Sequence, residues 1–344
     1  MGKFTVWIFI FFMTTLIGNG QEIFPHERKI KMESNYSEFQ ITAHNQVDDV
    51  SLSGNLVVPS ENFSKVVFIV PGSGPETRHN HPFLTEAFLD KNIAVFRYDE
   101  HGNGSSTGTY NDYSYTLPML GRDVHSLFEK LKTIPVLEGK IFGMLGHSYG
   151  GMGILEAMEM GIEPDFLVFL ACPVQKHGAY FIHQIENDNP ILMDKFKYKT
   201  LEEKIKVMEI INDEIGKNSH LPNQEIRKIA YKKAKEIGYT KKRYKKFSYF
   251  STPYNLEMIK RNFEPIFKNL AIPTLYAIGE KDQLISSKKE TQILETMQNP
   301  NIETKVFEGI GHFFKEDPVK IMEAYDINEE PKKFITNWVK DLVL

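Results

Sequence analysis

A glycine-rich turn at residues 146–150 constrains the fold of this chain more than any other segment. The turn reads Gly-His-Ser-Tyr-Gly and follows the apolar run 141–145, which is typical of a buried strand. Residues 151–158 can continue as a helix. A serine at the centre of so tight a turn adopts a strained backbone conformation, and only small neighbours let helix and strand pack closely. The segment therefore predicts a strand, a sharp turn and a helix.

The rest of the chain alternates short apolar runs with helical patterns. Residues 38–42 and 51–58 alternate polar and apolar side chains, which predicts a half-exposed antiparallel hairpin. Buried strands are predicted at residues 66–70, 93–96, 141–145, 166–170, 274–278 and 304–307, with helices at about 82–91 and 120–132. This alternation predicts an α/β fold, in which a mostly parallel sheet carries helices on both faces and an N-terminal hairpin at its edge.

A stretch of about a hundred residues between Pro173 and Pro273 interrupts the alternation, although one crossover needs only a few tens of residues. Within it, helical spacing relates Leu201, Ile205, Met208, Ile211 and Ile215. The stretch is also basic, with 16 Lys and Arg against 7 Asp and Glu over residues 195–246. We interpret it as a helical cap with solvated charged faces. The alternatives are a basic cap that attracts anionic substrates or a membrane surface, and nucleic-acid binding through residues 241–246.

The first twenty residues have the layout of a secretory signal peptide. Lys3 supplies a positive start, residues 4–17 carry no charge, and Gly18 and Gly20 are small residues suited to a cleavage site. The run is short for a membrane span, which needs about 20 residues, although an uncleaved anchor is the alternative. We therefore expect a secreted or periplasmic protein without stable membrane insertion after cleavage. The organisation we predict is a signal peptide (1–20), an N-terminal strand region (21–65), a first core part (66–173), a cap insertion (174–271) and a second core part (272–344).

Composition excludes some sites. The single cysteine, Cys172, permits no disulfide within the chain and no thiolate metal site. The eleven histidines are scattered, and the net charge of −4 favours no particular partner. We expect no metal, no cofactor and no nucleic-acid partner, and the oligomeric state stays open.

Ser148, the serine at the centre of the glycine-rich turn, is the candidate nucleophile, and two residues later in the chain can activate its hydroxyl. Asp282 follows the predicted strand 274–278, and His312 follows the strand 304–307. Because sites in open α/β sheets gather at the carboxyl ends of the strands, both residues are expected near Ser148. The chain order Ser, Asp, His is that of the hydrolases whose serine sits on such a turn. His312 is the expected general base and acid, and Asp282 its orienting carboxylate, with Glu280 as a competing acid.

An oxyanion hole needs two N–H donors. The Tyr149 N–H is one, and the loop 71–76 after the first buried strand supplies the other, with Ser73 preferred and Gly74 second. The loop 97–106 contains Asp99 and His101, for which we prefer a structural role over a second acid/base pair or a metal site.

These motifs carry a resemblance to the α/β-hydrolase superfamily over residues 66–344. The segment Val-Pro-Gly-Ser-Gly-Pro at 70–75, paired with Arg-Tyr-Asp-Glu-His-Gly-Asn-Gly-Ser-Ser at 97–106, resembles bacterial secreted esterases near the dienelactone-hydrolase and prolyl-oligopeptidase-like branches. The resemblance implies a helical cap after the sixth core strand and a carboxylic ester hydrolase without a cofactor. The chain departs from the pattern at His101, where the family usually has arginine.

The sequence therefore predicts a serine hydrolase that acts on a small-molecule ester. One rival is an aminopeptidase, which needs carboxylates such as Glu202, Glu203 or Glu209 to hold a substrate ammonium group. Another is a catalytically silent binding protein on the same scaffold.

Overall fold

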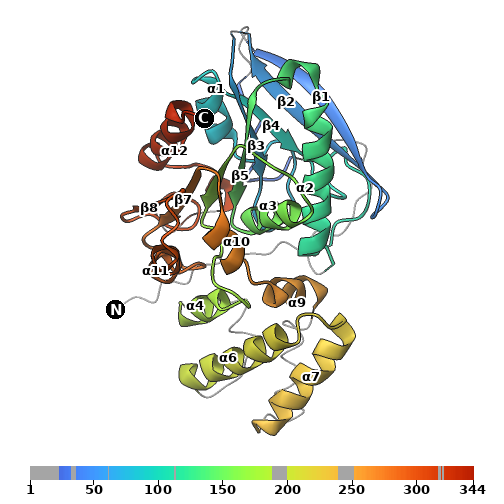
Figure 1. Cartoon of the computed structure of the whole chain (residues 1–344), viewed down its shortest axis with the longest axis vertical. Coiled ribbons are helices and arrows are strands. Elements are labelled where there is room, and N and C mark those ends of the chain that lie inside the picture. The colour runs from blue at the N-terminus through green and yellow to red at the C-terminus, as the bar shows by residue number, and fades with distance from the viewer. Residues whose placement is uncertain are drawn as a thin grey trace.

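An eight-stranded sheet forms the centre of the molecule (Figure 1), a computed structural model that describes residues 23–31, 36–60, 62–111, 114–187, 200–238, 252–316, 319 and 321–344. The spatial order is β1-β2-β4-β3-β5-β6-β7-β8. The pairs β1–β2 and β2–β4 are antiparallel, and every later pair is parallel. The strands are β1 (Tyr36–Asn45), β2 (Val50–Pro59), β3 (Lys65–Val70), β4 (Ala94–Tyr98), β5 (Ile141–His147), β6 (Phe166–Leu170), β7 (Thr274–Gly279) and β8 (Ile302–Phe307).

The predicted fold class is confirmed, and each predicted strand is present with ends shifted by a few residues. The central strands β3, β4, β6 and β7 are buried along their whole length, so helices or loops cover both faces of the sheet. The half-exposed hairpin is wrong for β2, which is almost entirely buried. The loop after β4 covers it, since the backbone N–H of Ser53 donates to the hydroxyl of Ser106 at 2.9 Å.

Helices from outside the β6–β7 segment flank the sheet (Figure 1). Helix α2 packs against α3 and β1, α1 packs against α12, and α11 packs against β8. Helix α2 turns Leu120, Val124, Leu127 and Leu131 inward at helical spacing, as its amphipathic pattern predicts. The bounds are α1 (Pro82–Leu89), α2 (Leu117–Lys132), α3 (Tyr149–Glu159), α11 (Ser287–Met297) and α12 (Glu329–Asp341), with short 3₁₀ turns at Pro135–Leu137 and Ile321–Glu323.

The segment between β6 and β7 contains α4 (Tyr180–Glu186), α6 (Leu201–Lys217), α7 (Asn223–Glu236), α9 (Pro253–Lys260) and α10 (Glu264–Asn269). Figure 1 shows α4, α6, α7 and α9 grouped together at the lower end of the molecule. Helix α6 begins at the N-cap residue Thr200, whose hydroxyl accepts from the Glu203 N–H at 3.1 Å. Its predicted apolar spacing is confirmed for Met208, Ile211 and Ile215, which are buried, whereas Ile205 is half-buried and Leu201 is exposed.

An ion pair fastens these helices to the core. The guanidinium of Arg261, which follows α9, donates through Nη2 to Oε2 of Glu156 on α3 at 2.8 Å, and Nε contacts the other carboxylate oxygen. Glu156 is buried, so the pair fixes where α9 lies over α3. The basic run 241–246 and the predicted signal peptide lie outside the described residues. Within the described ranges, no helix has the length and apolar character needed to cross a membrane.

Candidate active site

Ser148 lies on a strained turn between β5 and α3. Its φ is +52° and its ψ is −117°, a conformation that costs a non-glycine residue about 1–3 kcal/mol. The turn is tight, because a Cβ at Gly150 would lie 2.1 Å from the carbonyl oxygen of Pro71. A Cβ at Gly146 would lie 2.5 Å from the Cα of Gly151. Glycine is therefore required at both positions for the helix to approach the sheet, as the sequence predicts.

The structure brings His312 and Asp282 into direct contact. Nδ1 of His312 lies 2.7 Å from Oδ2 of Asp282, and both side chains are buried. The other oxygen, Oδ1 of Asp282, accepts from the backbone N–H groups of Leu284 at 2.8 Å and Ile285 at 2.9 Å. These bonds hold the carboxylate in one orientation, so its hydrogen bond fixes the imidazole and leaves Nε2 as the nitrogen available to another group.

The competing acid Glu280 is used differently. Glu280 is exposed, and its carboxylate accepts from the backbone N–H of Gly309 at 2.9 Å. Glu280 therefore shapes the loop that leads to His312, while Asp282 contacts the imidazole itself.

His147, which the sequence analysis did not select, links the serine turn to the histidine loop. Its ring centroid lies 5.2 Å from that of His312, and its Nε2 lies 3.1 Å from the backbone oxygen of His312. Because a carbonyl can only accept, Nε2 of His147 carries the proton. Burial, together with the nearby His312, lowers the pKa of His147 to about 3, so its imidazole is neutral. The contact places the loop of His312 beside the residue that precedes Ser148.

A second histidine extends this contact. Nε2 of His81 lies 3.3 Å from Nδ1 of His147, and the His81 ring lies 3.9 Å from the ring of Tyr325. Burial also holds the pKa of His81 well below its usual value. His81, His147 and Tyr325 come from separate parts of the chain, so their contacts could not be predicted from the sequence.

The two predicted oxyanion donors belong to chain segments that adjoin Ser148. Tyr149 is the first residue of α3, so its N–H has no acceptor within its own helix. The loop after β3 passes close to the serine, because a Cβ at Gly72 would lie 3.8 Å from the Cβ of Ser148. The next residue is Ser73, the preferred second donor. Gly74, the other candidate, has a φ of +126°.

Tyr254 of α9 covers this loop and was also missed from the sequence. Its hydroxyl donates to the Ser73 hydroxyl at 2.9 Å, and its ring centroid lies 5.0 Å from that of Tyr149. Thr252 caps α9, accepting from the Asn255 N–H at 3.3 Å, and Pro253 occupies the first turn. These local signals predict a helix, but nothing in them indicates which loop Tyr254 contacts.

Asp99 and His101 make contacts within and next to their own loop, which agrees with the structural role preferred for them from the sequence. Asp99 is buried and forms an ion pair with Arg78, with 2.6 Å between Nη2 and Oδ2. It also accepts from the Ser105 N–H at 2.8 Å. His101 lies 3.6 Å from the carboxylate of Asp123 and packs against the ring of Tyr115. Asp99 thus contacts its own loop and Arg78.

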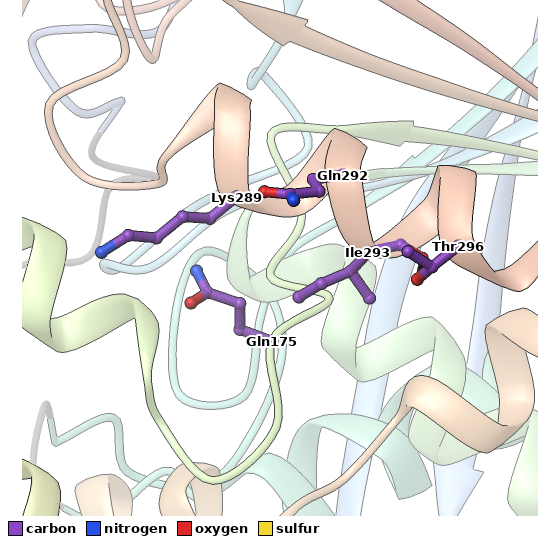
Figure 2. Close-up of a pocket in the computed structure, with 5 residues that line it drawn as sticks. All are labelled: Gln175, Lys289, Gln292, Ile293 and Thr296. Carbon is purple, nitrogen blue, oxygen red and sulfur yellow. Dashed lines mark hydrogen bonds between the residues drawn. The ribbon is translucent and has the colours of Figure 1, made fainter.

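A surface hollow on α11 involves other residues. Figure 2 shows Lys289, Gln292, Ile293 and Thr296 on this helix, with Gln175 opposite them on the loop after β6. Glu290 fixes Gln175, because the Glu290 carboxylate accepts from Nε2 of Gln175 at 2.7 Å and from the Gln175 backbone N–H at 2.9 Å. Burial raises the pKa of Glu290 to about 7. The hollow contains none of the predicted catalytic residues.

Comparison with known proteins agrees with this fold. Residues 61–318 match the family described as "Serine aminopeptidase, S33". An esterase of Pyrococcus furiosus is 17% identical with a TM-score of 0.56, covering 94% of this chain and 99% of its own. A bromoperoxidase of Bacillus anthracis is 16% identical with a TM-score of 0.53 (88% and 100% covered). A thermophilic esterase of Thermogutta terrifontis is 16% identical with a TM-score of 0.51 (89% and 98%).

No curated protein matches the sequence. At these identities the solved structures establish the shared fold, and the family match, which spans most of the chain, establishes the membership. The chain is an α/β hydrolase that belongs to the serine aminopeptidase S33 family.

Proposed function

We propose that this protein hydrolyses carboxylic esters through an acyl-enzyme intermediate on Ser148. The observation that carries the proposal is the strained Ser148 at the end of β5, combined with the buried His312–Asp282 pair after β8 and β7. The three strands are parallel and part of one sheet, so their carboxyl ends share one edge. Strain at a single serine of this kind is typical of functional sites.

The proposed reaction has two acyl-transfer steps. Nε2 of His312 accepts the proton of the Ser148 hydroxyl while Oγ attacks the ester carbonyl carbon. The carbonyl oxygen becomes an oxyanion, which the N–H groups of Tyr149 and Ser73 stabilise. The C–O bond to the alcohol breaks and His312 returns the proton to that alcohol. Water then attacks the acyl-enzyme with the same proton transfers and releases the acid.

The test is hydrolysis of a panel of aryl esters by wild type and Ser148→Ala. We expect the variant to lose at least about 10³-fold in kcat while its thermal unfolding stays cooperative. Ser126→Ala on α2 is the matched control, because it removes a serine hydroxyl that donates to the backbone oxygen of Arg122 at 2.8 Å, outside the proposed site. Wild-type turnover by Ser148→Ala would exclude the mechanism. Failure of an active-site phosphonate to label Ser148 would favour a silent binding protein instead.

Aminopeptidase activity is the second candidate, because the family description names it. An aminopeptidase needs a carboxylate near the serine to bind the substrate ammonium group. Of the cap carboxylates considered from the sequence, Glu202 and Glu209 are exposed on α6. The groups that meet the Ser73 loop and Tyr149 are aromatic and hydroxyl-bearing, which suits an uncharged acyl group better. Faster cleavage of aminoacyl anilides than of matched aryl esters would reverse this preference.

A further inference from the structure

Three potential metal ligands gather where the N-terminal segment crosses the loop after β3. They are His26, Glu27 and Glu76, and their ligand atoms all lie within 4.8 Å of one another. Glu27 is 7% exposed and Glu76 is 4% exposed. The side chain of His26 is 13% exposed, so it closes the cluster toward solvent. Burial of two carboxylates this close together is unfavourable unless a cation or a proton offsets their charge.

The carboxylates are oriented by neighbouring donors, as metal-binding carboxylates usually are. Glu27 accepts from the Thr77 N–H at 2.6 Å and from the Thr77 hydroxyl at 2.8 Å. Oε1 of Glu76 accepts from the Tyr325 hydroxyl at 2.7 Å and lies 2.9 Å from Nε2 of His26. These contacts hold one oxygen donor from each glutamate and one imidazole nitrogen at the same place.

The second oxygen of Glu76 gives an independent indication of a ligand. Oε2 is buried, and within the described part of the chain no hydrogen-bond donor reaches it. A buried acceptor left without a partner costs about 1–3 kcal/mol, so native proteins rarely leave one unused. A further carboxylate lies nearby, because the Glu76 N–H donates to Oε2 of the buried Glu100 at 3.1 Å. The orphaned oxygen thus belongs to a group of three buried carboxyl side chains, those of Glu27, Glu76 and Glu100.

We propose that His26, Glu27 and Glu76 bind a divalent transition-metal cation, with Zn²⁺ as the ion that the donor set fits. Zn²⁺ accepts imidazole nitrogen and carboxylate oxygen at about 2.0–2.2 Å, and tetrahedral ligands then lie about 3.4 Å apart. The cluster needs only small side-chain shifts to reach that spacing. The imidazole makes Ca²⁺ and Mg²⁺ poorer matches, since both prefer all-oxygen sites. Three protein ligands leave a fourth position for water.

The competing occupant is a proton. Burial, together with Glu76, raises the pKa of Glu27 to about 7, so a protonated Glu27 beside a His26–Glu76 hydrogen bond would also relieve the charge. A bound metal ion would displace that proton, so a titration with Zn²⁺ distinguishes the two occupants.

The site has a structural role in this proposal, and no catalytic step passes through it. Glu76 lies three residues after Ser73, so the cation would tie the N-terminal segment to the loop of the proposed oxyanion donor. Tyr325 connects the same glutamate to the ring of His81, which contacts His147. The cation is therefore expected to stiffen this side of the catalytic residues.

The experiment uses the whole chain after dialysis against a chelator. Zn²⁺ is titrated in by calorimetry with a competing chelator present, and bound zinc is counted by elemental analysis. We expect one equivalent of Zn²⁺ per chain, a rise in Tm on binding, and at least about 10-fold weaker binding in Glu76→Gln and in His26→Gln. Co²⁺ in place of Zn²⁺ should give visible absorption bands that His26→Gln alters.

The matched control is His44→Gln. It removes an exposed imidazole that lies 3.6 Å from the carboxylate of Asp49, and it should leave the stoichiometry and the affinity unchanged. Absence of saturable Zn²⁺ binding would overturn the proposal in favour of the proton. Wild-type affinity in His26→Gln would also overturn it, and this variant decides the question if Glu76→Gln does not fold. Loss of ester hydrolysis in Ser148→Ala has no bearing on zinc binding, so the two proposals fail independently.

Discussion

Nε2 of His147 donates a hydrogen bond to the backbone carbonyl of His312 across 3.1 Å. The two residues are far apart in the chain but each adjoins a proposed catalytic group, since His147 precedes Ser148 and His312 is the proposed base. The bond fixes the loop of His312 through its main chain, while Asp282 fixes its ring. His147 is therefore a positioning residue for a proton transfer that depends on geometry within about 1 Å.

Replacing His147 with phenylalanine should lower kcat for aryl esters by about 10- to 100-fold with a smaller change in KM, because the ring is kept but the donor that anchors the loop of His312 is lost. Steady-state kinetics on purified protein measure this. His177→Phe is the control: Nδ1 of His177 makes a similar contact with the backbone oxygen of Ile259 at 3.2 Å, away from Ser148. Equal losses in both variants would contradict a specific role for His147.

The neutral His147 also predicts a pH dependence of stability. Its pKa is about 3 in the folded protein, with burial as the main cause, and about 6.5 when unfolded. Below pH 6.5 the unfolded chain therefore binds more protons, and the stabilisation is lost as the pH falls, by up to about 1.4 kcal/mol per pH unit. Urea unfolding at pH 7, 6 and 5 should show that the difference in free energy of unfolding between wild type and His147→Phe narrows as the pH falls. If the difference in free energy of unfolding were the same at all three pH values, His147 would not be buried in its neutral form.

Replacing the carboxylate by an amide should have very different effects on kcat at Asp282 and at Glu280. Asp282→Asn should reduce kcat by about 10²- to 10⁴-fold, because the amide cannot stabilise the imidazolium and favours the wrong tautomer of His312. Glu280→Gln should change kcat less than about 3-fold, since its side chain keeps an oxygen that accepts from the Gly309 N–H. The measurement is kcat/KM with one aryl ester across pH 5 to 9. A larger loss in Glu280→Gln would reverse the assignment.

Tyr254 and Ser73 should behave as a coupled pair. Each of Tyr254→Phe and Ser73→Ala removes the same 2.9 Å hydroxyl contact, while the ring of Tyr254 and the N–H of Ser73 are retained. We expect each variant to change kcat/KM by about 2- to 10-fold and the double variant to add little beyond either one. A double-mutant cycle on kcat/KM gives the coupling. Additive effects would show that the contact does not influence the oxyanion loop.

The sheet, the serine turn and the positions of Asp282 and His312 after β7 and β8 could all be predicted from the sequence. Buried runs of four to eight apolar residues report strands directly, and the carboxyl ends of parallel strands share one edge whatever the details of packing. This is why Ser148, Asp282 and His312 could be placed by element before any contact was known. The predicted helix at Leu201 to Ile215 succeeded for the same reason, since its pattern is local.

The side-chain contacts of the site, in contrast, were visible only in the folded structure. It selected Asp282 over Glu280, brought Tyr254 onto Ser73, and joined His81, His147 and the loop of His312. It also brought His26 and Glu27 close to Glu76, although the two segments lie some fifty residues apart and neither has ligand spacing of its own. Such contacts depend on how loops cross above the sheet edge. Periodicity records which face of a strand or helix is buried, but it carries no information about the partner that a loop residue meets.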